Sequence, residues 1–320
     1  MRHVPVLLSK VIESLNLAPG KNIIDCTLGD AGHSEEILKH TGPNGKLIGI
    51  DADAESLFRA KKYLYDYSTR VVFERNNFEH LQKILSEKKF GPVHGILMDF
   101  GWSSPQFEER GRGFSFMKRN ESLDMRYDTH LRCAHMTHDP PKDIEGNPLY
   151  GSCTAAELVN NLSADDLREI FKKYGEENLS RELGEAIVKK REITIFETVG
   201  DLVDLVLAVY RKKLKTDKEI PWIGGLHPAT KVFQALRIVV NDELGVIERV
   251  LPQAIDILES GGRLAVITFH SLEDRIVKHY FKKNSSNITI ITKKPIVCSK
   301  EEYDQNPSSR SAKLRVIEKK

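Results

Sequence analysis

The sequence predicts an α/β fold: a mostly parallel sheet of about seven strands, interrupted by an inserted all-α segment. The first observation behind this prediction is a unit repeated between residues 21 and 99. In it, a short β-rich run and a polar or glycine turn precede a helix-length stretch of mixed charge. The second is that apolar residues between about residues 154 and 213 recur at helical spacing. Strands joined by helices form parallel sheets, which bind ligands beyond the carboxyl ends of their strands.

Four strands are expected in the repeated part, at Asn22–Thr27, Lys46–Asp51, Val71–Glu74 and Val93–Asp99. After the helical segment, a buried strand is expected at Leu264–Thr268, following a Gly-Gly pair, and a helix near Leu272–Lys283. The last two strands, Ile288–Thr292 and Leu314–Glu318, are joined by a loop without a helix. We therefore expect them to be antiparallel neighbours, with one reversed strand at the edge of the sheet.

The helical segment carries two signals for the start of a helix. In each, a hydroxyl residue precedes an acid by three positions, Thr154 with Glu157 and Ser163 with Asp166. Such pairs satisfy the free amides at the beginning of a helix. The expected division of the chain is a core of residues 1–116 and 226–320 and an inserted helical domain of residues 117–225.

Composition excludes several classes of protein. The 320 residues are 40% apolar and 29% charged, and no apolar run approaches the roughly twenty residues that span a bilayer, so we expect no membrane segment. The net charge of +2 is too small to coat a nucleic acid by bulk attraction. Residues 270–320, however, hold 12 Lys or Arg against 6 Asp or Glu, so a polyanion is expected to meet this segment first. A solvated basic face is the alternative.

The four cysteines are far apart and form no C-x-x-C pair. This spacing suggests neither a zinc ribbon nor a disulfide framework, and it favours a reducing compartment. The N-terminus lacks the apolar core of a secretion signal, so we expect a cytoplasmic protein. We also expect no metal site in the histidine-rich segment, because the spacing of its candidate ligands is irregular. Those ligands are His130, Cys133, His135, His138 and Cys153.

A glycine-bearing turn follows the first predicted strand, in the sequence Asp25-Cys-Thr-Leu-Gly-Asp-Ala-Gly-His-Ser34. Such turns bring a nucleotide close to the backbone, and a dinucleotide site is one candidate. The spacing G-x-x-G lacks the full G-x-G-x-x-G pattern, however, and Asp30 places a negative charge where a pyrophosphate would lie. A cationic ligand suits this turn better.

The next two strands also lead to candidate ligand residues. Asp51 lies 22 residues beyond Gly29, about where such folds bind a ribose diol. Asp53 fits a helix cap equally well, and for either aspartate taken alone both roles stay open. Phe78, after the third strand, covers either an adenine or the core.

The fourth strand ends in a dense cluster of acceptors, hydroxyls and aromatic rings, Asp99-Phe-Gly-Trp-Ser-Ser-Pro-Gln106. An ordinary strand exit rarely needs so many, which favours a functional site. Taken together, the four strand ends suit an adenosine joined to a positively charged amino acid. S-adenosyl-L-methionine fits this description better than NAD or ATP does.

Ordered blocks of motif residues run nearly from end to end of the chain: His3–Leu8, Asp25–Ser34, Gly95–Gln106, Arg112–Phe116, Leu123–Arg126, Tyr174–Glu177, His227–Leu244, Phe269–Arg275 and Asn306–Arg315. Through them the chain resembles the RsmH (MraW) family of cytidine N4-methyltransferases. The resemblance implies a class I (Rossmann-like) methyltransferase core and an inserted helical domain that would engage RNA. It also implies methyl transfer from S-adenosyl-L-methionine to a cytidine in the decoding region of 16S rRNA. The expected partners are this rRNA and the small ribosomal subunit, and a homodimer is left open.

By the same resemblance the cofactor contacts fall on Ala31, Gly32, His33, Asp51, Phe78, Asp99 and Gln106. The chain departs from the family pattern in three places. The family usually has glycine at Ala31, a small apolar residue at Trp102 and a much shorter link than residues 128–154. If Ala31 needs a positive φ, the strain is on the order of 1 kcal/mol, or about fivefold in affinity. Trp102 either narrows the base pocket or offers a stacking platform.

Methyl transfer to cytosine N4 requires that the delocalised lone pair of the amine be localised. Acceptors near the amine would do this and would take up its developing positive charge. The candidate groups are Asp99, the hydroxyls of Ser103 and Ser104, and a backbone carbonyl beside Pro105. The cytidine must also be unstacked, against Trp102, Phe114 or Phe116.

Two other functions stand as alternatives. One is a catalytically impaired RNA-binding protein of ribosome assembly that keeps the cofactor pocket, which Ala31 and Trp102 suggest. The other is an NAD-linked oxidoreductase, which Asp30 and the missing third glycine disfavour. His270 is a further candidate for contacting the substrate, although Ser271 and Asp274 after it form an ordinary capping box.

Overall fold

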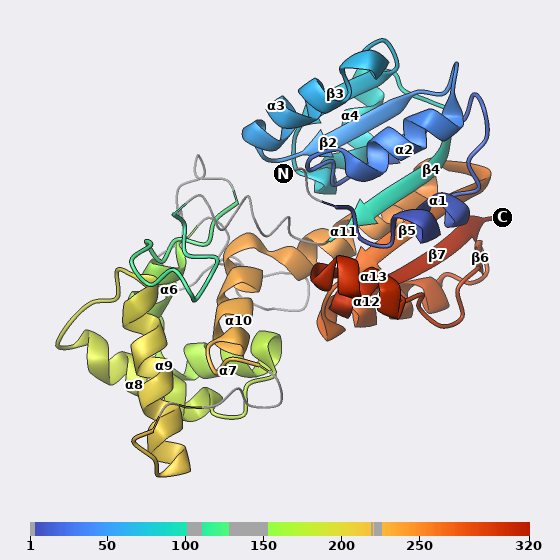
Figure 1. The fold of residues 1–320 in the computed structure, drawn as a ribbon. Helices are drawn as coiled ribbons and strands as arrows, with labels where there is room; N and C mark the ends of the chain where they lie inside the picture. Colours follow the sequence, from blue (N-terminus) through green and yellow to red (C-terminus); the bar gives the residue numbers. More distant parts are fainter. Residues whose placement is uncertain (1–3, 101–110, 128–152, 219, 221–225) are drawn as a thin grey trace. The chain divides into compact units, whose positions relative to one another are not determined.

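The computed structural model describes residues 4–100, 111–127, 153–218, 220 and 226–320. The chain forms two compact units, which we call the core unit (Met1–Ser103 with Leu244–Lys320) and the helical unit (Ser104–Glu243; Figure 1). These bounds differ from the division drawn on the sequence at residues 116 and 226. Helix α10 (Thr230–Asn241) belongs to the helical unit because it packs against α7 (Ala164–Gly175).

A seven-stranded sheet in the order β3-β2-β1-β4-β5-β7-β6 forms the centre of the core unit. Its strands are β1 (Ile23–Asp25), β2 (Leu47–Asp51), β3 (Val71–Arg75), β4 (Val93–Asp99), β5 (Leu258–Thr268), β6 (Ile288–Ile290) and β7 (Lys313–Lys319). Strands β1 to β5 are parallel, and β7 is antiparallel to both of its neighbours. The mostly parallel sheet of the class I methyltransferase type and the antiparallel pairing of the last two strands are therefore confirmed.

Two details of the sheet differ from the expectation. The reversed strand does not lie at the edge, because the chain returns from β6 to place β7 between β6 and β5. Strand β5 begins at Leu258 rather than Leu264. Gly261 adopts a φ of +76° within this strand, and the register with β4 shifts between Val93 and Gly95. The Gly-Gly pair is thus an irregularity inside the strand and not the turn that precedes it.

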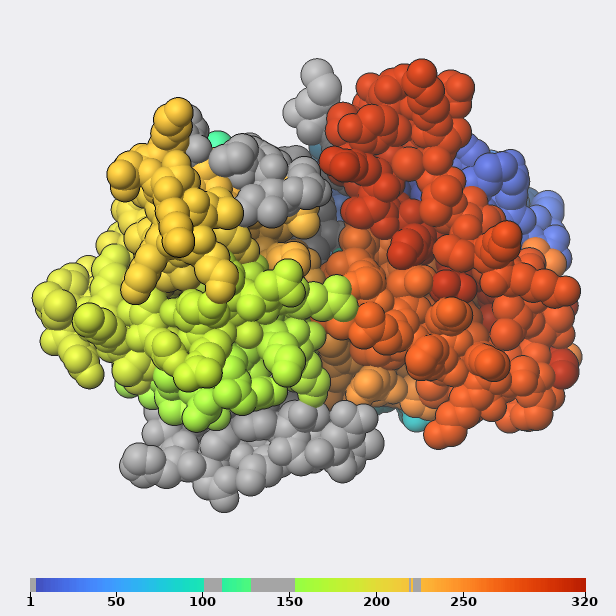
Figure 2. Space-filling model, turned by 90° about the horizontal axis from the view of Figure 1, so that it is seen from below, coloured from blue at the N-terminus to red at the C-terminus, as the bar shows by residue number. Residues whose placement is uncertain are grey.

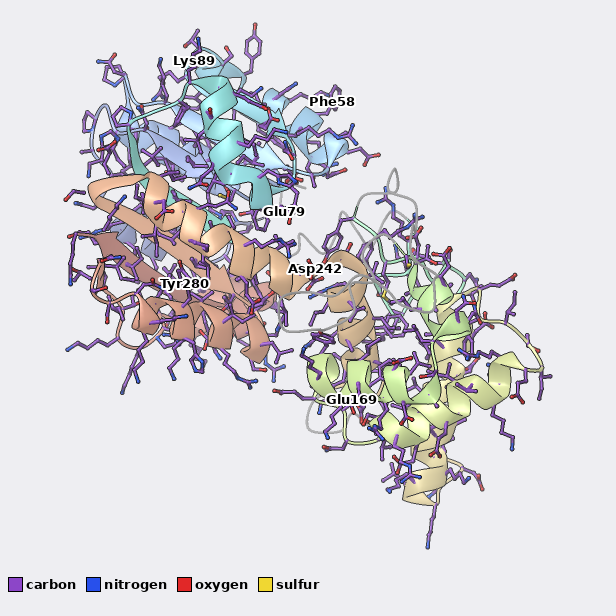
Figure 3. All side chains as sticks on the ribbon, turned by 180° about the vertical axis from the view of Figure 1, so that it is seen from behind. Phe58, Glu79, Lys89, Glu169, Asp242 and Tyr280 are labelled. Carbon is purple, nitrogen blue, oxygen red and sulfur yellow. The ribbon has the colours of Figure 1, made fainter. Side chains whose placement is uncertain are left out.

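Helices cover both faces of this sheet. One apolar cluster is enclosed by α1 (Leu8–Ser14), α2 (Gly32–Thr41) and α3 (Ala54–Tyr63), and the other by α4 (Leu81–Lys88), α11 (Glu243–Ile257) and α12 (Ser271–Lys283). On the second face, Arg249 of α11 donates from Nε to Oε2 of Glu79, which precedes α4, over 2.8 Å (Figure 3). Within the described ranges, no helix has the length and apolar character needed to cross a membrane.

The helical unit is built from α6 (Ala155–Asn161), α7, α8 (Ser180–Arg191), α9 (Val199–Leu214) and α10. Both predicted capping boxes are confirmed: the side chain of Thr154 caps α6 together with Glu157, and that of Ser163 caps α7 together with Asp166. All five helices contribute buried apolar residues to one cluster. The unit therefore has a hydrophobic core of its own.

Two local expectations are wrong. Cys153 is disulfide-bonded, because spacing along the sequence does not reveal which cysteines the fold brings together; the other candidate ligands of the histidine-rich segment lie outside the described residues. Helix α12 is capped by His270 with Glu273, not by Ser271 with Asp274. The backbone is still extended at His270 (φ −133°), so Ser271 is already the first helical residue.

Gly49 in β2 leaves space for the side chain of Leu28, the residue that leads into the glycine turn. A Cβ atom on Gly49 would lie 2.7 Å from Cδ1 of Leu28, which is buried. We expect Gly49→Ala to lower the free energy of unfolding by about 1–3 kcal/mol, measured by urea denaturation. Gly42→Ala is the control, because a Cβ there would meet no atom closer than 3.7 Å. Equal losses in both variants would contradict this explanation.

Candidate cofactor site

The register of the parallel strands brings two aspartates to the same level of the sheet. Asp25 in β1 pairs with Gly49 on one side and Leu97 on the other. Two residues further along, Thr27 is therefore level with Asp51 and with Asp99. The amide of Asp99 donates to Oγ1 of Thr27 over 2.8 Å, so the two predicted carboxylates flank the end of β1 at the carboxyl edge of the sheet.

Buried hydrogen bonds fix the turn between β1 and α2. Asp25 is 1% exposed and accepts from the amide of Thr27 (3.1 Å) and from Oγ of Ser34 (2.6 Å). Burial raises the pKa of the Asp25 carboxyl, and the hydrogen bonds from Ser34 and Thr27 oppose that rise. The two ends of the turn are thus tied together by one side chain, which preorganises the loop for a ligand.

The middle of this turn has an unusual backbone. Gly29 and Ala31 both have positive φ, +50° and +58°. The positive φ of Ala31 meets the condition under which backbone strain is expected at this residue, at a cost of about 1 kcal/mol. Gly32 begins α2 in a tight place, because a Cβ there would lie 3.0 Å from Cγ of Pro5, which would have to shift by a few tenths of an ångström.

His33 connects the turn to the end of β4 and to the N-terminal segment. Its imidazole is buried, with Nε2 2.9 Å from the carbonyl oxygen of Val6. A carbonyl only accepts, so Nε2 carries the proton. Nδ1 then lies 3.9 Å from Oδ2 of Asp99. His33 and Asp99, which are far apart in sequence, therefore meet at the candidate site.

Among the residues that the structure describes, each carboxylate oxygen of Asp51 accepts one hydrogen bond. Oδ2 accepts from the amide of Gly29 and Oδ1 from the amide of Asp53, both over 2.8 Å. An ionised carboxylate has about four lone-pair sites, so one on each oxygen is left for a pair of hydroxyls. Asp53 instead caps α3, accepting from the amides of Glu55 and Ser56. Asp51 and Asp53, whose roles the sequence left open, therefore differ in the structure: Asp53 caps a helix, and Asp51 does not.

The ionisation of Asp51 makes ligand binding dependent on pH. Burial raises the pKa of its carboxyl to about 6, in spite of the two backbone hydrogen bonds. A diol donates two hydrogen bonds to the ionised form, so below that pH a proton must leave on binding. We expect the dissociation constant of S-adenosyl-L-methionine to be flat above pH 6 and to rise up to about tenfold per pH unit below it, as measured by calorimetry. A profile that is the same in Asp51→Asn would contradict this.

Other contacts modify the expectations for Asp30 and Phe78. Oδ1 of Asp30 accepts from Nε of Arg59 over 2.8 Å. Its charge is therefore partly balanced within the protein, and Asp30 argues less strongly against an anionic ligand than the sequence alone suggested. Phe78 is partly buried and stacks on Phe100, with ring centroids 5.9 Å apart. Its packing against the core is observed, and its contact with an adenine stays a prediction.

The remaining predicted site residues, Trp102, Ser103, Ser104, Pro105 and Gln106, lie outside the described residues. Sequence reasoning missed the supporting roles of Thr27, Ser34, Arg59 and Val6. Thr27 and Ser34 belong to the quoted turn, and their hydroxyls beside Asp25 were an available signal. Arg59 and Val6 act across the fold. Val6 belongs to the quoted block His3–Leu8, but nothing in that block indicates a contact with His33, and no local pattern marks Arg59.

Comparisons with known proteins identify the family of the chain. The sequence pattern of the MraW methylase family matches residues 1–320. The chain is similar to ribosomal RNA small subunit methyltransferase H of Clostridioides difficile, at 41% identity over 334 residues, which cover 99% of this chain and 98% of that protein. It is 44% identical over 318 residues to the protein of the same name from Dictyoglomus thermophilum, covering 99% and 97% of the two chains. Among solved structures, an rRNA methylase from Streptococcus thermophilus aligns with 100% of this chain and 98% of its own at 10% identity and a TM-score of 0.42. The chain belongs to the MraW methylase family.

Proposed function

We propose that this protein transfers a methyl group from S-adenosyl-L-methionine to the N4 amine of a cytidine in the decoding region of 16S rRNA, in the cytoplasm. The observation that supports this most is the meeting of Asp51, the glycine turn and Asp99 at one edge of the sheet. The name shared by the two relatives, ribosomal RNA small subunit methyltransferase H, points to the same substrate.

The described residues suit the cofactor. Asp51 would accept from the two ribose hydroxyls, and the tight backbone around Gly29 and Gly32 lets a ligand approach closely. Phe78 would cover the adenine. S-adenosyl-L-methionine supplies an electrophilic methyl group on a sulfonium. The carboxylate of Asp99 and the imidazole of His33 lie at the side of the turn where a positively charged amino-acid group would be accommodated.

The groups that would interact with the cytosine amine are Asp99 and residues that follow it in the chain. In our proposal, Asp99, Ser103, Ser104 and a carbonyl beside Pro105 accept hydrogen bonds from the N4 amine. Those bonds localise its lone pair on nitrogen, and one acceptor takes the proton that the amine loses. Holding both reactants in line provides much of the acceleration, so loss of one acceptor slows transfer without stopping it.

The helical unit, which includes the inserted segment 117–225 expected from the sequence, is proposed to contact the RNA. Two aromatic side chains considered as platforms for the base already stack within this unit. Phe114 stacks on Tyr127 with centroids 5.6 Å apart, and Phe116 on His227 at 4.6 Å. One face of each ring is therefore covered by the protein, and a base would need the other.

Nucleoside analysis tests the proposal directly. The protein is incubated with S-adenosyl-L-methionine and under-modified small subunits, and the digested rRNA is examined by mass spectrometry. We expect N4-methylcytidine at a single position. Bound rRNA without product would instead favour the impaired RNA-binding protein, and methylation at another atom of the base would refute the N4 assignment.

A further inference from the structure

The reversal of β7 carries a basic part of the chain to the same edge of the sheet as Asp99. Because β7 runs against β5, it begins at the carboxyl edge, where Lys313 pairs with Thr268. On the next strand, Asp99 pairs with Ile267 of β5. Lys313 is therefore separated from Asp99 by one strand, or about 10 Å of sheet width. The C-terminal segment that contains it forms a large part of the face of the core unit that is seen in Figure 2 (orange to red).

The connection from β6 to β7 stays near this edge. Ile296 forms a bridge with Leu314 at the beginning of β7, and Lys293 and Lys294 lie just before it, both exposed. Arg310, also exposed, lies three residues before Lys313. We call Lys293, Lys294, Arg310 and Lys313 the rim cations.

Arg310 is held on a firmly anchored turn. It belongs to the short 3₁₀ helix Pro307–Ser311, in which Ser309 is buried and donates from Oγ to the carbonyl of Asn306 over 2.7 Å. Asn306 in turn donates from Nδ2 to the carbonyl of Val4 over 3.0 Å. A cation mounted in this way loses little backbone entropy when it binds a ligand.

The rim cations are not neutralised by ion pairs with acidic side chains of the described residues, with the partial exception of Lys313. Within the described residues, Lys293, Lys294 and Arg310 form no ion pair. Asp274 lies 3.8 Å from Nζ of Lys313, but its carboxylate is bound through both oxygens by Arg315, at 2.7 and 3.2 Å. The neighbouring helix α13 (Lys300–Gln305) carries three acids and one lysine, so it is not part of the proposed phosphate-binding surface.

We propose that the rim cations bind the phosphate backbone of the rRNA next to the cytidine that is presented to Asp99. This inference rests on the proposed function. A cytosine is neutral, so the charge available for positioning it lies on the phosphates of the surrounding strand. Lysine and arginine side chains that neutralise phosphates release counterions, which gives salt-dependent affinity. Exposed cations on the edge that carries the reacting group suit this role.

The experiment compares two triple variants of the full-length protein that lose the same charge. The rim variant is Lys293→Ala, Lys294→Ala and Arg310→Ala. The control variant is Lys278→Ala, Lys282→Ala and Lys283→Ala, three exposed lysines of α12. Affinity for naked 16S rRNA and for under-modified subunits is measured against salt concentration, with methyl-transfer kinetics and calorimetric titration of S-adenosyl-L-methionine.

For the rim variant we expect the slope of log affinity against log salt to become shallower by roughly 2–3, since each lost phosphate contact contributes about 0.7–0.9. The KM for RNA should rise tenfold or more, whereas kcat stays within about twofold and cofactor affinity is unchanged. The control variant should resemble the wild type. Arg310→Lys should keep most of the affinity, because a phosphate accepts either cation.

Three outcomes would overturn the proposal: a rim variant that binds like the control, a loss of the same size in both variants, or a loss seen with subunits but not with naked rRNA. The last would assign the rim to an acidic protein partner. A wild type that binds rRNA without methylating it would contradict the proposed function. The rim proposal would then still be judged by the slopes alone.

Discussion

Replacement of Asp99 by alanine is expected to lower kcat for methyl transfer about a hundredfold, the lower end of what a positioned proton acceptor contributes. Asp99 ends β4, and its amide is held by Thr27 while its carboxylate lies beside His33. The bond to Thr27 fixes the backbone from which the carboxylate extends. Without the carboxylate, the amine of the bound cytidine loses the acceptor that localises its lone pair. Single-turnover measurements with saturating rRNA and cofactor would isolate this step from binding.

Asp304→Ala is a suitable control for Asp99, since Asp304 is an exposed carboxylate of the same unit at the end of α13. It should leave kcat unchanged. Asp99→Asn keeps the shape and one acceptor but not the charge, so we expect an intermediate rate. If Asp99→Ala raised only the Kd of the cofactor and kcat were as in the wild type, Asp99 would be a cofactor ligand and not an acceptor for the amine.

The second large effect is expected at Asp51, where substitution by alanine should weaken S-adenosyl-L-methionine binding at least tenfold. Hydrogen bonds to an ionised carboxylate contribute about 1.5–3 kcal/mol, and a diol would make two of them. Alanine also leaves the amides of Gly29 and Asp53 without their acceptor. Because Gly29 belongs to the glycine turn, part of the loss would come from a less ordered turn. Calorimetry would give the affinity, and thermal unfolding the change in stability.

Asp53→Ala provides the matched comparison two residues away. Its carboxylate caps α3, accepting from the amides of Glu55 and Ser56 and from Oγ of Ser56. Removing it should lower stability by about 0.5–2 kcal/mol, as for other N-caps, and leave the cofactor affinity within about twofold. If both substitutions weakened cofactor binding equally, the ribose would lie between the two aspartates. If Asp51→Ala left the cofactor affinity unchanged, the assignment of Asp51 to the ribose would be wrong.

The strands that the sequence predicted well are those with a simple local signal. Strand β4 has the bounds expected of it because a run of apolar residues ends in a charged one at Asp99. The start of β5 was misplaced because a Gly-Gly pair usually marks a turn, and only the pairing with β4 shows that here it lies inside a strand. The position of β7 within the sheet depends on its neighbours, so no pattern within the strand itself indicated it.

In the candidate site, too, residues with a local sequence signal were predicted, whereas contacts that depend on the fold were not. Asp51 and Asp99 were identified by their positions at the ends of strands, because the topology of a parallel sheet brings such positions to one edge. Ala31 was identified through the family resemblance. The partner of Asp30, and the contact between His33 and Asp99, depend on side chains whose sequence separations are 29 and 66 residues. Such contacts follow from packing, which a single sequence does not display.

The central place of β7 also has a consequence for folding. Strands β6 and β7 are successive in the chain, whereas α12 and β6 separate β5 from β7 in the sequence. Until β7 pairs with β5, the backbone groups along that edge of β5 have no partner strand, and such an edge can pair with another chain. Insertion of β7 is therefore the step that protects this half of the sheet from aggregation.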